Sequence, residues 1–142
     1  MKRLNIKSLL FVAMSLVAFA GCEKEHEPEE PAESHHTVVT YSECKAQKGF
    51  NDITTSVRYE NGTLYFSHTD IEFNCAINDV SVVPEINGQA INVTINEVLG
   101  ELVADCNCPR DVNYTIDNIK EGTYTIVVKV HGQVIYQGEI SC

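Results

Sequence analysis

The stretch Tyr59-Glu60-Asn61-Gly62-Thr63-Leu64 decides the fold of this chain, because it predicts a tight hairpin between two antiparallel strands. Asn61 and Gly62 stand at the two positions of a type I′ turn that need positive φ. A two-residue loop predicts three pairs on one mostly apolar face: Tyr59 with Leu64, Val57 with Phe66 and Thr55 with His68. The polar face holds the pairs Arg58 with Tyr65 and Ser56 with Ser67. Turn chemistry and hydrophobic alternation therefore predict the same register.

Strand signals continue from this hairpin through residues 37–142, where Thr, Val, Ile and Tyr dominate and turn residues are frequent. No window has a convincing helical period. The predicted strands are Thr37–Ser42, Ile53–Glu60, Thr63–Thr69, Asp79–Val83, Ala90–Glu97, Val112–Ile116, Thr123–Val130 and Gln133–Ile140. Short strands at this spacing predict a single all-β domain, an immunoglobulin-like antiparallel β-sandwich of about seven to eight strands.

The last predicted hairpin turns near His131-Gly132, and two registers are open for it. A two-residue loop places Lys129 opposite Val134. A three-residue loop instead makes the pairs Val130 with Val134 and Val128 with Tyr136. The hydrophobic pattern favours the three-residue loop, although Gly132 is not at the usual end position of such a loop.

Residues 117–125, Asp-Asn-Ile-Lys-Glu-Gly-Thr-Tyr-Thr, resemble the turn that enters a late strand of immunoglobulin-like domains. Tyr124 stands where such domains have a tyrosine corner, a tyrosine whose hydroxyl bonds to backbone upstream. An ordinary core tyrosine is the alternative. The resemblance implies a fold and carries no function with it.

The N-terminus predicts a secretory signal peptide over residues 1–21. Three cations and no acid occupy residues 1–7, an apolar run follows from Leu9 to Ala20, and small residues precede Cys22. The 12-residue run would be about 18 Å long as a helix, at roughly 1.5 Å per residue. A bilayer core is about 30 Å thick, so the run is too short for a comfortable transmembrane helix.

Phe19-Ala20-Gly21-Cys22 resembles the bacterial lipobox, with Phe19 in place of the usual Leu. The resemblance implies cleavage before Cys22 and attachment of fatty acyl chains, such as palmitate, to this cysteine. Three acyl chains anchor a protein durably in a membrane. Residues 22–36 hold six Glu, two Pro and no large apolar residue, which predicts a disordered acidic tether. A Cys followed at once by acids also resembles the export signal of Bacteroidota-type surface lipoproteins, which implies the outer face of the outer membrane.

Charge excludes one class of partner. Cleavage before Cys22 removes three cations and leaves seven basic and twenty acidic residues, a net charge of −13. Binding to nucleic acid depends on Lys and Arg that neutralise phosphates. The mature chain therefore predicts no nucleic-acid partner, and nothing in the sequence points to a cofactor.

Five cysteines follow Cys22, and an exported domain predicts disulfides between them. They are Cys44, Cys75, Cys106, Cys108 and Cys142. Because five is odd, at most two bridges form and one thiol is left over. Cys106 and Cys108 flank a single residue, so a bond between these two is not expected. The connectivity and the identity of the free cysteine stay open at this point.

Three pieces of the domain are similar to small lipoproteins of gut-type Bacteroidota. They are Phe73-Asn74-Cys75, Asp105-Cys106-Asn107-Cys108-Pro109 and Gly122-Thr123-Tyr124. The resemblance implies a fold and a cellular address, and it implies no activity.

A metal site is the alternative reading of the same cysteines. His68 falls on the apolar face of its strand and could join Cys75, Cys106 and Cys108 as ligands for zinc or Cu(I). The C-x-C spacing differs from the usual C-x₂-C knuckle, and a buried hydrogen-bonded His68 is the plainer interpretation. His26, His35 and His36 in the tether are a weaker candidate. A leftover thiol with His68 or His131 as its base would make a thiol catalyst.

No enzyme signature stands out in the sequence. There is no Gly-x-Ser-x-Gly turn and no Gly-rich phosphate loop, and Asp70, Glu72 and Asp79 read as solvated acids. Asp105, Asp111 and Asp117 lack the spacing of a calcium loop. We therefore expect a non-enzymatic surface module, tethered by lipid, that binds an unknown protein or glycan. An inhibitor of extracellular proteases, acting through the cysteine-rich loop Ala104–Arg110 with Pro109 to stiffen it, is the second expectation.

Overall fold

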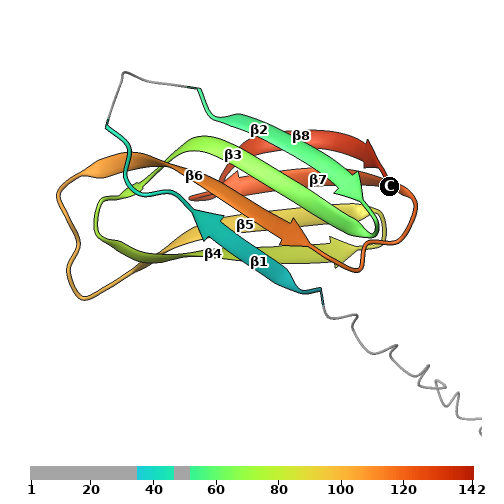
Figure 1. The fold of residues 1–142 in the computed structure, drawn as a ribbon, viewed down its shortest axis with the longest axis horizontal. Helices are drawn as coiled ribbons and strands as arrows, with labels where there is room; N and C mark the ends of the chain where they lie inside the picture. The colour runs from blue at the N-terminus through green and yellow to red at the C-terminus, as the bar shows by residue number, and fades with distance from the viewer. Residues whose placement is uncertain (1–34, 47–51) are drawn as a thin grey trace, which may run out of the picture. The chain divides into compact units, whose positions relative to one another are not determined.

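A computed structural model describes residues 35–46 and 52–142, and these residues form a two-layer β-sandwich (Figure 1). The eight predicted strands are all present and no helix occurs in the described part. The strands are β1 (Thr37–Tyr41), β2 (Thr54–Glu60), β3 (Thr63–Asn74), β4 (Ile77–Asn87), β5 (Ala90–Leu99), β6 (Asn107–Ile116), β7 (Thr123–Val130) and β8 (Gln133–Ser141). The predicted β-sandwich is therefore confirmed.

The first sheet has the strand order β1-β6-β3-β2, and the second has the order β4-β5-β7-β8. Every pair in the first sheet is antiparallel. In the second sheet β5 and β7 are parallel, which departs from the predicted antiparallel arrangement. Between β5 and β7 the chain crosses to the first sheet as β6, and such a crossover allows β7 to return in the direction of β5.

The β2–β3 hairpin has the predicted register. Tyr59 pairs with Leu64, and the same alignment continues to Thr55 opposite His68. Asn61 and Gly62 have φ values of 50° and 80°, as the type I′ turn requires. A long-range hydrogen bond stabilises the turn: the backbone N–H of Ile119 donates to the carbonyl oxygen of Gly62 at 2.9 Å.

Strand β3 extends five residues beyond its predicted end because a β-bulge resets its alternation. His68 pairs with Val112, and the next partners on the two strands are Ile71 and Arg110. The extra residue lets Phe66 and His68 point inward before the bulge and Ile71 and Phe73 after it. Asp70, at φ 60°, lies within the bulge. An uninterrupted alternation cannot predict this continuation.

Strand β4 continues through Pro84, where the prediction ended it at Val83. Pro84 pairs with Val93 although it has no backbone N–H. β4 is the edge strand of its sheet, and proline is tolerated at an edge because no further strand needs its N–H.

The β7–β8 hairpin combines parts of both open registers. Its turn is a two-residue loop, with Val130 opposite Gln133 and Lys129 opposite Val134, so the favoured three-residue loop is wrong. His131 and Gly132 take φ values of 50° and 78°. A bulge between Val128 and Lys129 then brings Val128 opposite Tyr136, the pair that the three-residue loop predicted.

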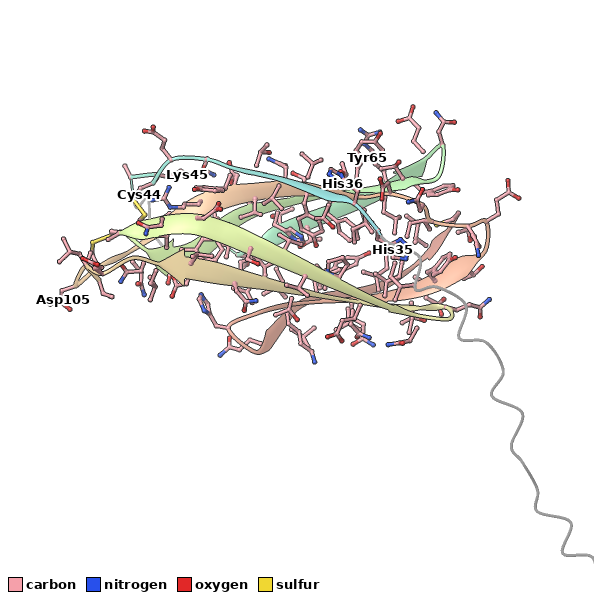
Figure 2. The ribbon with its side chains drawn as sticks, turned by 90° about the horizontal axis from the view of Figure 1, so that it is seen from below. His35, His36, Cys44, Lys45, Tyr65 and Asp105 are labelled. Atoms are coloured by element: carbon pink, nitrogen blue, oxygen red, sulfur yellow. A yellow bond between two sulfur atoms is a disulfide. The ribbon has the colours of Figure 1, made fainter. Side chains whose placement is uncertain are left out.

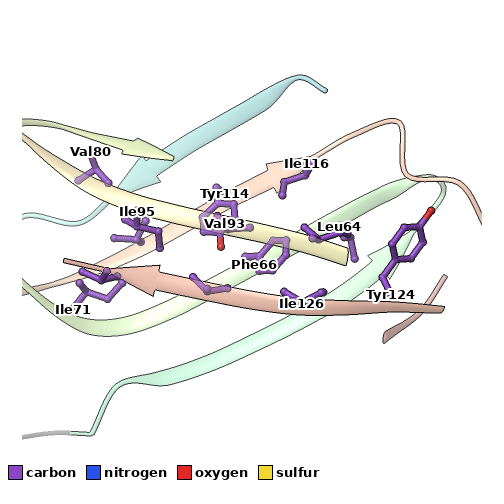
Figure 3. Close-up of a cluster of buried hydrophobic side chains, with 14 of the residues drawn as sticks. Leu64, Phe66, Ile71, Val80, Val93, Ile95, Tyr114, Ile116, Tyr124 and Ile126 are labelled. Atoms are coloured by element: carbon purple, nitrogen blue, oxygen red, sulfur yellow. The ribbon is translucent and has the colours of Figure 1, made fainter. Parts of the chain in front are cut away.

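The core lies between the two sheets and is made by alternate residues of both (Figure 3). Tyr124 is one of these buried residues and is 8 % exposed. Tyr124 is therefore a core residue. The fully buried large side chains are Phe73, Leu64, Ile71, Ile91, Ile95, Ile116, Ile126, His68, Val93, Val112 and Val128.

Candidate functional site

Two disulfides form at one end of the sandwich. Cys44, which follows β1, is bonded to Cys108 in β6, and Cys75, between β3 and β4, is bonded to Cys106. Both pairs have a Cα–Cα distance of 5.6 Å. Cys142 is the free cysteine among those that the structure describes. The prediction of at most two bridges with one thiol left over, and of no bond between Cys106 and Cys108, is confirmed.

The two disulfides are close neighbours in space. The sulfur atoms of Cys44, Cys75 and Cys108 all lie within 4.8 Å of one another. Figure 2 shows Cys44 near the end of the sandwich where Asp105 also lies. Arg110, two residues after Cys108 on the same face of β6, is only 8 % exposed and donates to the carbonyl oxygen of Cys75 at 3.5 Å.

His68 is not part of this cysteine cluster, so the predicted ligand set of His68 with Cys75, Cys106 and Cys108 is wrong. The side chain of His68 is fully buried on β3 before the bulge. Its Nδ1 lies 2.8 Å from Thr55 Oγ1 and its Nε2 lies 3.2 Å from Tyr114 Oη. Burial lowers the pKa of His68 to about 4 and raises the pKa of Tyr114. His68 is a hydrogen-bonded core histidine.

The segment predicted as an inhibitory loop, Ala104–Arg110, is only partly a loop. β6 begins at Asn107, so Cys108, Pro109 and Arg110 are strand residues paired with β3. The prediction of a loop is therefore wrong for these three residues, because the disulfide to Cys44 and the pairing with β3 hold them inside the sheet. The loop itself is the connection between β5 and β6.

The β5–β6 loop is held rigidly where it passes β3. The amide of Asn74 donates to the carbonyl of Ala104 at 2.7 Å and accepts from its N–H at 3.0 Å. The Cys75–Cys106 bridge fixes the loop two residues later. Just before this anchor, Leu102 is 82 % exposed and Val103 is 62 % exposed. The loop therefore presents two apolar side chains on a constrained backbone.

A shallow groove of about 350 Å³ crosses the outer face of the first sheet. The outward side chains form two rungs that run across all four strands. One rung is Val38, Thr115, Tyr65 and Arg58, and the next is Thr40, Asn113, Ser67 and Ser56. Except for Val38, these side chains carry a hydroxyl, amide or guanidinium group. The sequence predicted the polar face of the hairpin, but not its continuation over β6 and β1.

Arg58 and Tyr65 define one side of this groove. The guanidinium carbon of Arg58 lies 3.9 Å from the centre of the Tyr65 ring. A carboxylate oxygen of Glu60 lies 2.6 Å from Nη1 of Arg58. The cation is therefore held against the ring and its charge is balanced. Figure 2 shows Tyr65 on the outer side of the sheet.

Lys45 joins two acids next to the β3 bulge. Its Nζ lies 2.9 Å from Asp70 Oδ1 and also bonds Asp111 Oδ1. The hydrogen bonds that Lys45 donates to the carboxylates of Asp111 and Asp70 raise its pKa. The Asp111 carboxylate also accepts the backbone N–H of Asp70 at 3.2 Å. The carboxylates of Asp70 and Asp111 therefore stabilise the bulge through their bonds to Lys45 and to the backbone.

The histidines next to the tether and on the last turn make local contacts. Nδ1 of His35 lies 2.9 Å from the carbonyl oxygen of Asp117, and the backbone N–H of His36 bonds the Asp117 carboxylate. Nε2 of His131 lies 3.2 Å from the carbonyl of Glu72, in a second hollow of about 300 Å³ beside Glu97. Neither His68 nor His131 lies beside the free Cys142, so the structure assembles no thiol–histidine pair there.

Several predictions concern residues that the structure does not describe. The signal peptide at 1–21, the lipidated Cys22, the acidic tether up to Ser34 and His26 all lie outside the described residues. In the described part, no helix has the length and apolar character needed to cross a membrane.

Comparison with known proteins gives no relative on which to base a function. No model of a protein family, no curated protein and no solved structure matches the chain.

Proposed function

We propose that this chain is a lipoprotein of the bacterial cell envelope whose folded domain is a non-enzymatic binding module for glycans. The groove on the outer face of β1-β6-β3-β2 carries the proposal. In this proposal, the lipid on Cys22 and the acidic tether hold the domain at the membrane surface, and the groove faces outward toward its ligand.

The chemistry of the groove suits a neutral sugar chain. Thr40, Asn113, Ser67 and Ser56 lie on neighbouring strands in one rung, so their short side chains form a continuous row across the sheet. Hydroxyls and amides both donate and accept hydrogen bonds, as sugar hydroxyls do. Tyr65 adds an aromatic ring with a polar end, the kind of side chain that contacts a partly apolar, partly polar ligand.

Charge favours a neutral ligand over a polyanion. Among the described residues that line the groove, Arg58 is the only cation, and Glu60 already balances its charge. A mature chain with a net charge of −13 repels polyanions at long range. The size of the groove, about 350 Å³, matches a short stretch of a ligand rather than a folded partner.

Affinity electrophoresis of the purified chain in gels containing neutral polysaccharides tests this proposal. We expect at least one of dextran, mannan, xylan or galactan to retard the chain. Tyr65→Ala and Asn113→Ala should abolish the retardation, because they remove the ring and the middle of the polar rung. Thr94→Ala is the matched control, since Thr94 belongs to a central strand of the opposite sheet and does not line the groove.

Two outcomes would count against glycan binding. One is the absence of retardation in the whole panel while the chain is folded. The other is equal retardation of wild type, Tyr65→Ala and Asn113→Ala. Turnover of any panel polysaccharide, or of peptides, would contradict the non-enzymatic part of the proposal.

A second candidate function, inhibition of an extracellular protease, is favoured by the β5–β6 loop. Leu102 and Val103 are exposed on a backbone fixed by Asn74 and by the Cys75–Cys106 bridge. A rigid loop loses little conformational entropy when a protease binds it. Titration against proteases that prefer apolar residues is the test, with Leu102→Asp as the variant expected to lose inhibition and Val83→Asp, on exposed β4, as the control. Absence of inhibition in every protease class would remove this candidate.

A further inference from the structure

The end of the sandwich that holds both disulfides brings four cysteines from three chain segments together. Cys44 follows β1, and Cys75 lies between β3 and β4. Cys106 directly precedes β6, and Cys108 is the second residue of β6. Three of the sulfurs are within 4.8 Å of one another, and the fourth, from Cys106, is bonded to one of these. In a tetrahedral zinc site, Zn–S bonds of about 2.3 Å place the ligand sulfurs roughly 3.8 Å apart.

We infer that reduction of the two disulfides converts this cluster into a four-thiolate site for a borderline or soft metal ion, Zn²⁺ or Cu⁺. A dithiol or phosphine reductant supplies two electrons to each disulfide, four in all, and is itself oxidised. Four protons complete the four thiols. Binding of Zn²⁺ displaces these protons and leaves a centre with a charge of −2, because the thiolate is the metal ligand.

The backbone around the cysteines holds them together independently of the sulfur–sulfur bonds. The N–H of Cys75 donates to the carbonyl of Cys106 at 2.9 Å. The N–H of Lys45 donates to the carbonyl of Pro109 at 3.0 Å, which fixes the residue after Cys44 beside the residue after Cys108. Cys108 itself pairs with Phe73 in the β3–β6 ladder. The ligands are therefore positioned before a metal arrives.

Arg110 supplies the positive charge that such a centre needs. It lies on the inward face of β6 like Cys108, and it is 8 % exposed. Its Nη1 and Nη2 donate to the carbonyl oxygens of Ser42 and Cys75, while its Nε is buried without a partner. It forms no ion pair with a carboxylate in the described part of the chain. A nearby guanidinium favours thiolate over thiol, and a buried cation is stabilised by an anionic partner.

Two other groups are excluded as ligands by position. His68 is bonded to Thr55 and Tyr114 in the core. Cys142 exchanges two backbone hydrogen bonds with Gly122, at 3.1 Å and 2.8 Å, next to the start of β7. These two residues therefore provide controls that separate the four-cysteine site from metal binding by His68 or by the thiol of Cys142.

The test uses the full-length chain, reduced with a phosphine under anaerobic conditions, and Co²⁺ as a spectroscopic probe for Zn²⁺. We expect one Co²⁺ per reduced chain, with thiolate-to-cobalt charge transfer and the visible bands of a tetrahedral site, and none in the oxidised chain. Zn²⁺ should displace the Co²⁺. Cys142→Ser should bind as wild type does, whereas Cys44→Ser and Cys106→Ser should lose the tetrahedral spectrum. Arg110→Met should bind about tenfold more weakly, as when a supporting group beside the ligands is lost.

Four results would overturn the inference. They are a folded reduced chain without cobalt bands, a reduced chain that unfolds and is not refolded by Co²⁺ or Zn²⁺, a Cys44→Ser variant with the wild-type spectrum, and a Cys142→Ser variant that loses it. Circular dichroism, recorded on the same samples, reports the folded state in each case.

Discussion

His68 and Tyr114 lie side by side in the core, with Nε2 of the imidazole 3.2 Å from the phenol oxygen and the ring centres 5.5 Å apart. On the other side of the imidazole, Oγ1 of Thr55 lies 2.8 Å from Nδ1 of His68. Both nitrogens of a neutral imidazole are thus satisfied, one as donor and one as acceptor. The pair forms a small polar network inside an apolar core.

Because of this network, we expect the free energy of unfolding to decrease when the pH becomes mildly acidic. Burial lowers the pKa of His68 from 6.5 to about 4 in the folded chain. As pH falls below 6.5, the unfolded chain binds a proton at this histidine that the folded chain does not bind. The free energy of unfolding should therefore be highest above pH 6.5 and fall by up to about 3 kcal/mol on the way to pH 4.

Urea unfolding at pH 7.5, 6, 5 and 4 measures this effect. His68→Leu should be less stable at pH 7.5, because it leaves Thr55 and Tyr114 without their partner, but it should show a smaller decrease toward pH 4. His131→Gln is the control and should follow the wild type. Equal pH dependence of wild type and His68→Leu would contradict the assignment.

The disulfide connectivity predicts a definite peptide map. Digestion without reduction should release Cys44 linked to Cys108 and Cys75 linked to Cys106, with Cys142 unlinked. Mass spectrometry of the digest reads these links directly. A peptide that joins Cys142 to any other cysteine would contradict the structure.

Removal of one bridge should destabilise the sandwich strongly. The Cys75–Cys106 bridge closes a loop with a sequence separation of 31 residues. Its replacement by two alanines should lower the free energy of unfolding by about 3–4 kcal/mol, because the unfolded chain gains the freedom that the bridge removes. Guanidinium titration of the double variant measures the change, and Cys142→Ala should shift the midpoint much less.

Cys142 should react slowly with alkylating reagents. Its side chain is partly buried, and burial raises the pKa of its thiol above the ordinary value of 9.0. Only the thiolate attacks the reagent, so alkylation of the folded chain at pH 8 should be slower than that of a small thiol. The rate should rise with pH, and unfolding in guanidinium should bring it to the small-thiol value. Equal rates for the folded and unfolded chain at pH 8 would contradict this.

Gly62→Ala should destabilise the β2–β3 hairpin by about 1 kcal/mol, because Gly62 has φ 80°, which alanine adopts only with strain. A Cβ at this position meets only an ordinary contact with the carbonyl oxygen of Ile119, so the strain comes from the backbone. Asn61→Gly, which keeps a residue suited to positive φ, should change stability by much less. Thermal unfolding compares the two variants.

Local sequence patterns predicted the β2–β3 hairpin correctly because its turn residues and its alternation act over only a few residues. They also placed His68 on the apolar face. They did not predict the continuation of β3, because the bulge at Asp70 depends on Asp111 and Lys45, which lie far away in the chain. The turn of the last hairpin was misjudged because the bulge after Val128 shifts the apolar pattern by one residue.

The candidate sites were less predictable than the fold. The groove needs β1 and β6 beside β3, and the parts of its two rungs come from residues 38–115. The cysteine cluster needs Cys44 and Arg110, which no local motif joins to Cys75. His68 was wrongly grouped with the cysteines, because the extended strand β3 separates His68 from Cys75 along its length.

The sequence by itself determined the all-β pattern of strands, the tight turn at Asn61-Gly62 and the odd number of domain cysteines, because each of these can be read without knowing which distant segments meet. Only the tertiary structure decided the parallel pairing of β5 with β7, the partners of the cysteines and the polar groove. These features arise where segments distant in the chain are brought together by burial of a shared core. Short-range sequence patterns do not specify which distant segments will come into contact.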